Sequence, residues 1–348
     1  MKNNKVNICY WNNNGGLTLD AEIISSILLK NDFDVFHNGY HKDFLTKFPR
    51  VRKLFWQFQK ACLVALSKAG IKRYAASIHL ETLTKSNLCV AHKNLMIPNL
   101  EWLSDDSFAL LAEVDLVLCK TKSAVQFFEQ QNLPAIYTSF TTISPYDEQY
   151  QQKPNTFVHI AGKSGSKGTF PLLKLWSKHP EWPKLTVLAS RTHYIESIIR
   201  PSLKEFESDN LYIIEDFIAA SELKRLQNES EIHLCLSEAE GFGHSLCEPM
   251  SCGAIVVTVD GYPMNELVQP DRGFLVKSHN HNPMAYGMRF YFDDDDFEIK
   301  INTIVNASTE EKQAIKFNTR QWFDDNDAFF KTTLVDAVNY SLNEKSQS

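Results

Sequence analysis

The chain of 348 residues has no long apolar run, no paired cysteines and only 13 glycines. No stretch reaches the roughly 18 consecutive apolar residues that a membrane-spanning helix requires. The first residues lack the basic start and apolar stretch of a signal peptide. Seven cysteines are scattered without a CxxC pair. This favours reduced, mostly buried thiols in a cytoplasmic protein over disulfides or a zinc site.

Charge of one sign does not dominate either. The formal net charge is −6 at pH 7, so there is no global basic excess of the kind that marks nucleic-acid binders. With 43% apolar and 22% charged residues, the composition is that of a soluble globular protein. The length suffices for two α/β domains.

Short apolar runs typical of strands alternate with longer helical patterns from end to end. The predicted strands are 6–11, 33–37, 74–79, 95–98, 115–119, 135–139, 156–161, 185–189, 211–214, 232–236, 254–259 and 274–276. The predicted helices between them include 20–30, 123–131, 169–178, 197–207, 220–227 and 245–252. Such alternation predicts an α/β fold with two doubly wound parallel sheets. From about Pro283 onward we expect helices, and a frayed tail at 343–348.

Two stretches suggest where chemistry takes place, because ligands of open α/β folds bind at the carboxyl ends of strands. The first is 237–266, SEAEGFGHSLCEPMSCGAIVVTVDGYPMNE. A predicted strand runs into a loop with Gly241 and Gly243, and a short helix follows. Glycines let a ligand approach the backbone, and the N–H groups at a helix start favour an anion such as a sugar diphosphate.

Two carboxylates flank this loop. Glu240 and Glu248 are eight positions apart, about two helical turns, so they project to the same side. Carboxylate oxygens are suitable acceptors for sugar hydroxyls. Taken alone, the pattern equally fits an ordinary strand–turn–helix with solvated glutamates.

The second stretch is 159–176, HIAGKSGSKGTFPLLKLW. Lys163 and Lys167 lie in a small-residue loop between a predicted strand and a predicted helix. A cation there would neutralise charge on a departing diphosphate, where it matters most in the transition state. Solvated loop lysines are the alternative interpretation.

Residues 240–248 resemble the E-x7-E motif of the retaining GT-B glycosyltransferases, the glycosyltransferase family 4-like enzymes or glycosyl transferases group 1. EGFG, a helix containing EPMSCG, the strand AIVV, then Gly261, Glu266 and GFLV follow the family order. The resemblance implies that Glu240 contacts the donor sugar and Glu248 the ribose of the nucleotide.

Further donor contacts are implied by the same resemblance. Backbone around the glycine loop would cradle the sugar and phosphates, Lys163 and Lys167 resemble the family's basic pair, and the loops at 189–191 and 215–217 border the base and ribose. The implied donor-binding residues are Gly15, Gly16, Lys163, Lys167, Arg191, Phe217, Gly241, Phe242, Gly243, His244, Ser245 and Glu248. His244 and Ser245 replace the small or apolar residues common in the family, and Arg191 also fits a plain surface position.

In the first half, Gly15 and Gly16 belong to a run, NNNGG, that looks like the family's glycine-rich loop after the first strand. A simple tight turn is the alternative. His79, Asn99 and Glu101 follow or end predicted strands and are candidates for the acceptor side. His79 also fits a core histidine, and Glu101 a carboxylate at a helix start.

The segment 45–73 is basic, with interleaved aromatics and no Asp or Glu. It fits either a helix lying on an anionic membrane surface or a surface helix with a buried aromatic face. Asp293–Asp296 has the D-x-D spacing of metal-dependent GT-A enzymes, but its distance from the other motifs favours a helix cap. We expect no metal and no other cofactor.

The resemblance implies a GT-B fold, with 1–145 binding the acceptor, 155–325 binding the nucleotide sugar, and 326–348 forming a helix that packs back toward the first domain. The implied activity is transfer of a hexose-type sugar, with retention, to a hydroxyl of a glycan, glycolipid or protein. A nucleotide-sugar epimerase or phosphorylase on the same fold stays open, as does a non-catalytic sugar-nucleotide binding protein.

Overall fold

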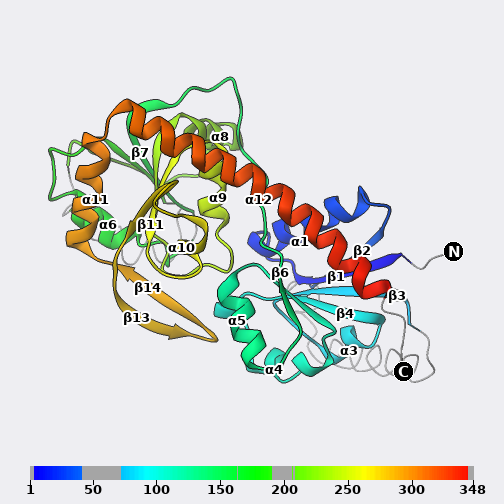
Figure 1. The fold of residues 1–348 in the computed structure, drawn as a ribbon. Helices are drawn as coiled ribbons and strands as arrows, with labels where there is room; N and C mark the ends of the chain where they lie inside the picture. The colour runs from blue at the N-terminus through cyan, green and yellow to red at the C-terminus, as the bar shows by residue number, and fades with distance from the viewer. Residues whose placement is uncertain (1–3, 41–71, 163, 190–205, 207, 344–348) are drawn as a thin grey trace. The chain divides into compact units, whose positions relative to one another are not determined.

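The computed structural model describes residues 4–40, 72–162, 164–189, 206 and 208–343. The chain folds into two compact units. Unit 1 comprises Met1–Thr141 and Asp327–Ser348, and unit 2 comprises Thr142–Asn326. Each unit contains a six-stranded sheet (Figure 1). The predicted α/β fold with two doubly wound parallel sheets is confirmed.

Unit 1 has the strand order β2-β1-β3-β4-β5-β6, and all neighbouring strands are parallel. The strands are β1 (Lys5–Trp11), β2 (Asp34–Tyr40), β3 (Tyr74–Leu80), β4 (Ala91–Ile97), β5 (Leu116–Cys119) and β6 (Ala135–Tyr137). The helical elements are α1 (Gly16–Leu29), α3 (Lys85–Leu88), η1 (Leu100–Trp102), α4 (Asp105–Phe108), η2 (Leu111–Glu113) and α5 (Lys122–Gln130). Strand β3 is buried along its whole length, as in parallel sheets covered on both faces.

Unit 2 has the order β12-β11-β10-β7-β8-β9, again all parallel. Its sheet strands are β7 (Lys153–Gly162), β8 (Leu185–Ala189), β9 (Leu211–Ile214), β10 (Ser230–Cys235), β11 (Ile255–Val259) and β12 (Gly273–Val276). The helices are α6 (Thr169–Trp176), α8 (Ala220–Glu229), α9 (His244–Ser251), α10 (Met264–Leu267), α11 (Asp294–Asn306) and α12 (Thr309–Asn343). Counted from β7, the order is 3-2-1-4-5-6, the dinucleotide-binding arrangement.

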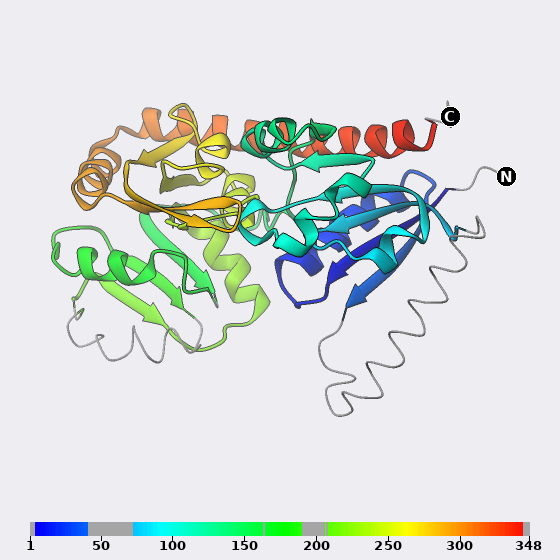
Figure 2. The ribbon, with the colours of Figure 1, turned by 90° about the horizontal axis from the view of Figure 1, so that it is seen from below.

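The prediction of helices from about Pro283 is wrong for residues 283–292 and is confirmed from Asp294 onward, where α11 and α12 follow. Strands β13 (Ser278–Met284) and β14 (Gly287–Phe292) form an antiparallel hairpin, drawn in yellow-orange in Figures 1 and 2, and helix α11 begins only at Asp294. The aromatic run Phe290–Phe292 favours a strand. Its partner contains the polar run HNHN, which has neither the apolar alternation nor the branched residues of a typical strand.

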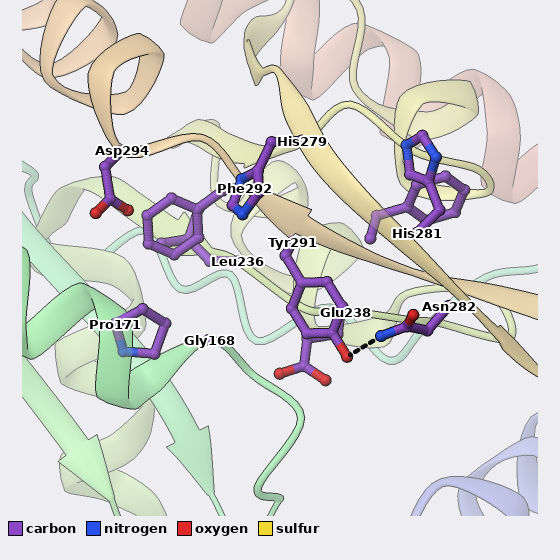
Figure 3. Close-up of a pocket in the computed structure, with 11 residues that line it drawn as sticks. Gly168, Pro171, Leu236, Glu238, His279, His281, Asn282, Tyr291, Phe292 and Asp294 are labelled. Carbon is purple, nitrogen blue, oxygen red and sulfur yellow. Dashed lines mark hydrogen bonds between the residues drawn. The ribbon is translucent and has the colours of Figure 1, made fainter.

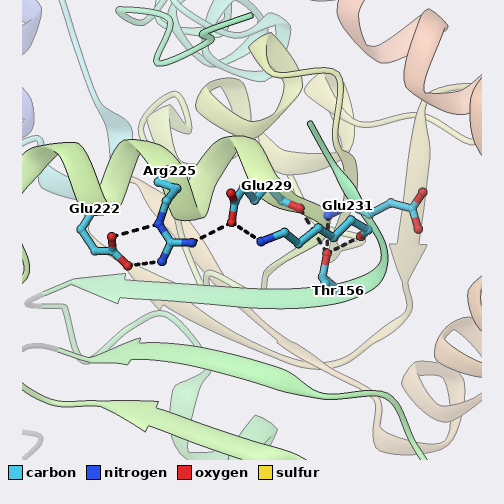
Figure 4. Close-up of polar contacts among 6 residues, drawn as sticks. Thr156, Glu222, Arg225, Glu229 and Glu231 are labelled. Carbon is cyan, nitrogen blue, oxygen red and sulfur yellow. Dashed lines mark hydrogen bonds and ion pairs between the residues drawn. The ribbon is translucent and has the colours of Figure 1, made fainter. Parts of the chain in front are cut away.

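A charged network holds the amino ends of β7 and β10 (Figure 4). Lys153 Nζ lies 2.6 Å from Glu229 Oε2, and Arg225 Nη1 lies 2.8 Å from the same carboxylate oxygen. Glu231 accepts a hydrogen bond from the backbone N–H of Asn155 at 2.9 Å. These contacts lie at the sheet edge opposite to the strand ends that bind ligands in such folds, so we assign them to stability.

Helix α12 contributes residues to both units, with the division between Asn326 and Asp327. In unit 1, Phe330 packs on Phe140 with ring centroids 4.5 Å apart, and Asp327 accepts a hydrogen bond from the Thr141 hydroxyl at 2.8 Å. In the parts of the chain that the structure describes, no helix is both long and apolar enough to cross a bilayer. The basic segment 45–73 lies outside the described residues apart from its last two.

Candidate functional site

The two loops singled out in the second half of the sequence follow adjacent strands. Strands β7 and β10 pair at the centre of the unit 2 sheet, where the strand order reverses direction. Connections on the two sides of such a point leave on opposite faces, which opens a crevice at the carboxyl ends of the strands. The loop after β7 leads into α6, and the loop after β10 leads into α9.

Gly168 brings these two loops into contact. Its φ is +67°, and a Cβ added there would lie 2.6 Å from the backbone oxygen of Leu236, which directly follows β10. The backbone N–H of Glu238 also donates to the oxygen of Ser166 at 3.0 Å. Lys167, between these two attachments, is therefore held beside the loop that carries Glu240.

Replacing Gly168 with alanine should therefore destabilise unit 2 by about 2 kcal/mol or more, because left-handed strain adds to a clash with backbone. Gly162→Ala is the matched control, since Gly162 also has a positive φ, +57°, but an added Cβ meets nothing within 4 Å. Urea unfolding followed by circular dichroism measures both. Equal losses in the two variants would show that the close approach to Leu236 contributes nothing.

Lys167, Glu240 and Ser245 form one polar cluster. Lys167 Nζ makes an ion pair with Glu240 and donates to Ser245 Oγ at 3.0 Å, and Ser245 Oγ donates to Glu240 Oε1 at 2.9 Å. The two charged side chains are only 20% and 13% exposed. Burial by itself raises the pKa of Glu240, but the charge of Lys167 and the hydrogen bonds outweigh it, so the net pKa is lowered and the carboxylate stays ionised.

Two helix starts lie at the same edge. Helices α6 and α9 follow Gly168 and Gly243, which are both in left-handed conformations and, as glycines, have no side chain that could cap the helix. An added Cβ at Gly243 would lie 2.9 Å from Leu246 Cδ1. Such helix starts present backbone N–H groups and the positive end of the helix dipole. With Lys167 they make a site suited to a diphosphate.

Glu248 lies on α9 within the same region. Burial raises the pKa of its carboxyl group, and Gln227 Nε2 donates to Oε2 at 2.8 Å. Glu248, Lys167 and Ser245 line a common recess of about 30 Å³. The sequence did not predict Gln227, which comes from α8 and lies 21 positions away. No local pattern marks such a contact.

His159 on β7 connects the elements that carry this cluster. Its Nδ1 donates to the oxygen of Leu234 at 2.7 Å, and its Nε2 accepts from the Thr169 hydroxyl at 2.9 Å. The ring thus ties β7 to β10 and to the first residue of α6. Both ring nitrogens are satisfied in the neutral form, and burial lowers the pKa of His159 to about 4.

The dependence of unfolding free energy on pH should report this buried histidine together with His79 and His233, because burial also lowers the pKa of each of these two to about 4. The unfolded chain takes up these protons near pH 6.5, the folded chain only near pH 4. Stability is thus present above pH 6.5 and is lost as pH falls through this window, by about 2 kcal/mol per histidine at pH 5. Urea midpoints at pH 7, 6 and 5 test this. His159→Gln should show a shallower decline, and a flat wild-type profile would contradict the assignment.

The remaining predicted donor residues are placed as follows. Phe217, in the loop after β9, is 90% exposed. Phe242 is 2% exposed, so only its backbone is available to a ligand, and its ring packs edge-on against His244 with centroids 6.1 Å apart. Gly241 lies in the loop between β10 and α9. Lys163 and Arg191 lie outside the described residues.

In unit 1 the strand order reverses between β1 and β3. After β1, Gly15 directly precedes α1 and Gly16 is its first residue. The Gly15 N–H donates to Asn13 Oδ1 at 2.9 Å, and an added Cβ at Gly16 meets nothing within 4 Å. The loop thus has a fixed shape with open space beside Gly16.

Glu81 directly follows β3 and Asn99 follows β4, and Asn99 Nδ2 donates to Glu81. Lys120, directly after β5, makes a buried ion pair with Asp20 of α1 at 2.6 Å. Burial raises the pKa of Glu81, although the charge of Lys120 and the bond from Asn99 act against this. Glu81, Lys120 and Asp20 were not predicted. The available signal was the position of two of them directly after strands.

The other acceptor-side candidates are buried. His79 lies on β3 with no exposed surface, its Nε2 is 3.1 Å from Asn94 Oδ1, and burial lowers its pKa to about 4. This is the environment of a core histidine. Glu101, in η1, is 7% exposed.

The acidic run at Asp293 caps a helix. Asp293 is the residue before α11, and its Oδ1 accepts a hydrogen bond from the Asp296 N–H at 2.9 Å. Within the described ranges, no group of three or more His, Cys, Asp or Glu residues is placed to hold a metal ion.

The fold is shared with several glycosyltransferases of solved structure. An enzyme from Rickettsia africae has a TM-score of 0.72 at 12% identity, covering 98% of this chain and 99% of that one. HepE from Anabaena, solved with UDP-glucose, has a TM-score of 0.66 at 14% identity, covering 97% and 99%. The pneumococcal O-GlcNAc transferase GtfA, solved with UDP and GlcNAc, has a TM-score of 0.63 at 15% identity over 81% of this chain, and this chain spans only 60% of its length.

Identities this low show the fold alone. A search of curated protein sequences finds no match to the chain. The family model of glycosyl transferases group 1 matches residues 126–310, more than half of the sequence, and includes the loops after β7 and β10. The chain therefore belongs to the glycosyl transferases group 1 family.

Proposed function

We propose that the protein transfers a hexose-type sugar from a nucleoside-diphosphate sugar to an acceptor hydroxyl, with retention of anomeric configuration. One observation carries the proposal. At the point of unit 2 where the strand order reverses, Lys167 and the glycine-preceded starts of α6 and α9 lie beside the carboxylates of Glu240 and Glu248. That arrangement fits a diphosphate flanked by two polyhydroxyl groups, the sugar and the ribose. The UDP found with GtfA and the UDP-glucose found with HepE make UDP-sugars the first donors to test.

The proposed step breaks the bond between the anomeric carbon and the β-phosphate oxygen, with the electron pair leaving on that oxygen. Lys167 and the start of α9 stabilise the charge that develops there. The acceptor hydroxyl attacks from the same face, and its proton passes to the departing phosphate. Glu240 orients the sugar through hydrogen bonds to hydroxyls and does not act as a free base.

Two further residues of unit 2 fit the nucleotide. The largely exposed ring of Phe217 offers a face on which a base can stack. Glu248, bonded on one side to Gln227, retains acceptor capacity for ribose hydroxyls. Since lysine and helix starts supply positive charge, we propose that transfer proceeds without a metal ion.

For unit 1 we propose acceptor binding by the loops after β3 and β4, where Glu81 and Asn99 lie, together with the predicted Glu101. The acceptor is a glycan, glycolipid or protein hydroxyl. An epimerase or a phosphorylase on the same fold is the second candidate, and a binding protein without turnover the third. An epimerase would convert the donor with no acceptor present, whereas a binding protein would shift its melting temperature with nucleotide yet release no sugar.

The test is a thermal-shift screen of UDP, GDP, ADP and their sugars, followed by NMR of the anomeric configuration of the product. One nucleotide should raise Tm, and Glu248→Ala should weaken its binding about 10- to 100-fold because a charged hydrogen bond is lost. Glu222→Ala, at an exposed glutamate on α8, should leave the affinity unchanged. Binding that survives Glu248→Ala unchanged would overturn the assigned ribose contact, and product of inverted configuration would overturn retention.

A further inference from the structure

The hairpin β13–β14 covers a cavity that lies next to the proposed donor site. The cavity has a volume of about 540 Å³ and lies between the hairpin, the start of α6, the end of β10 and the start of α11 (Figure 3). Its size is within the usual range for small-molecule sites, about 300–1,000 Å³. We call it the hairpin pocket. The lining residues that matter here are Gly168, Glu238, Asn282, Tyr291, Phe292 and Asp294.

The hairpin pocket shares a wall with the proposed donor site. Gly168 directly follows Lys167, and Glu238 precedes Glu240 by two positions. The backbone oxygen of Glu238 accepts from the N–H of Phe290 on β14 at 2.8 Å. The loop that carries Glu240 is therefore hydrogen-bonded to the hairpin, and a ligand in the pocket would lie against the back of that loop.

The walls combine aromatic surface with polar groups. Tyr291 points toward Glu238 and Asn282 in Figure 3, and its hydroxyl accepts from Asn282 Nδ2 at 3.4 Å. Phe292 contributes a buried apolar floor. A flat apolar surface edged by carboxylate, amide and phenol groups matches a pyranose ring, which has an apolar face and hydroxyls around its rim.

The charges of the pocket favour a neutral ligand. Among the described residues that line it, none is lysine or arginine, so a phosphate would find no permanently charged cationic side chain in the lining. Its two carboxylates already face compensating charge. Glu238 lies 3.4 Å from Arg289 Nη1, and Asp294 is in the first turn of α11, at the positive end of the helix dipole.

We propose that the hairpin pocket is a sugar-binding subsite that holds one uncharged hexopyranosyl unit of the acceptor. The proposal rests on the proposed function, because an acceptor exists only if the protein is a transferase. It assigns to the hairpin a role in acceptor choice, separate from the nucleotide contacts of Lys167 and Glu248.

The test uses saturation-transfer NMR on the full chain with saturating UDP and three probes: methyl α-D-glucopyranoside, methyl β-D-galactopyranoside and methyl α-D-mannopyranoside. At least one probe should bind the wild type. Tyr291→Ala should weaken that binding at least tenfold, while Tyr286→Ala, at the hairpin turn and outside the pocket lining, should retain it. The Tm shift produced by UDP should be the same in all three proteins.

The subsite is overturned if the wild type binds none of the probes, or if Tyr291→Ala and Tyr286→Ala lose probe binding equally. The proposed function still stands in that case if UDP raises Tm as expected. A probe displaced by UDP-glucose but not by UDP would show that the pocket holds the donor sugar, which overturns the acceptor assignment. Absence of any nucleotide shift in the wild type overturns the proposed function and the subsite together.

Discussion

Lys167→Met should lower kcat by about 100- to 1,000-fold, the usual effect of removing one group that stabilises developing charge. Methionine keeps an unbranched apolar side chain but removes the cation that would face the departing diphosphate. KM for the donor should rise as well, since the same charge attracts the ground-state diphosphate, but by a smaller factor. Initial rates at varied donor concentration separate the two effects.

A matched control is available on the following helix. Lys174 lies on α6 and is exposed, so Lys174→Met changes the same residue type without touching the site. A second control addresses folding, because Lys167→Met leaves the partly buried Glu240 without its ion-pair partner. The double variant Lys167→Met/Glu240→Gln removes that unpaired charge and should regain stability yet stay inactive. If Lys167→Met alone kept kcat within threefold of the wild type, Lys167 would not stabilise the departing diphosphate.

The sequence predicted the sheets well because their signal is local. Each strand is a short apolar run, and parallel strands with helices between them produce that pattern without reference to distant residues. The hairpin β13–β14 was missed for the converse reason. Its polar strand is held by pairing with β14, and pairing between strands does not appear in the composition of either one.

The site shows the same division between local and distant signals. Glu240, Glu248 and Lys167 could be named because each belongs to a contiguous loop-and-helix pattern with glycines. Their contact could not be derived, since Lys167 and Glu240 are 73 positions apart. That contact depends on the close approach of Gly168, in the loop after β7, to Leu236, directly after β10. Such an approach exists only once the two strands have paired. Gln227, which no local pattern singles out, was missed for this reason.

Glu240→Gln should separate donor binding from transfer more sharply than any other single change. Glutamine has nearly the same shape and still accepts hydrogen bonds, but it removes the negative charge that Lys167 now faces. An incoming diphosphate would no longer share the lysine with a carboxylate, nor lie beside a like charge. UDP should therefore bind about 3- to 10-fold more tightly, a gain of roughly 1 kcal/mol.

Transfer should nevertheless fall by about 100-fold, because the charged hydrogen bonds from sugar hydroxyls to the carboxylate become weaker neutral ones as the sugar reacts. Calorimetric titration with UDP and initial rates with the full donor give the two values on one protein. A rise in UDP affinity together with a fall in turnover requires that Glu240 contacts the sugar and also competes with the diphosphate for Lys167. If UDP affinity and turnover fell together, Glu240 would instead act by holding Lys167 in place, and the sugar contact would have to be assigned to another residue.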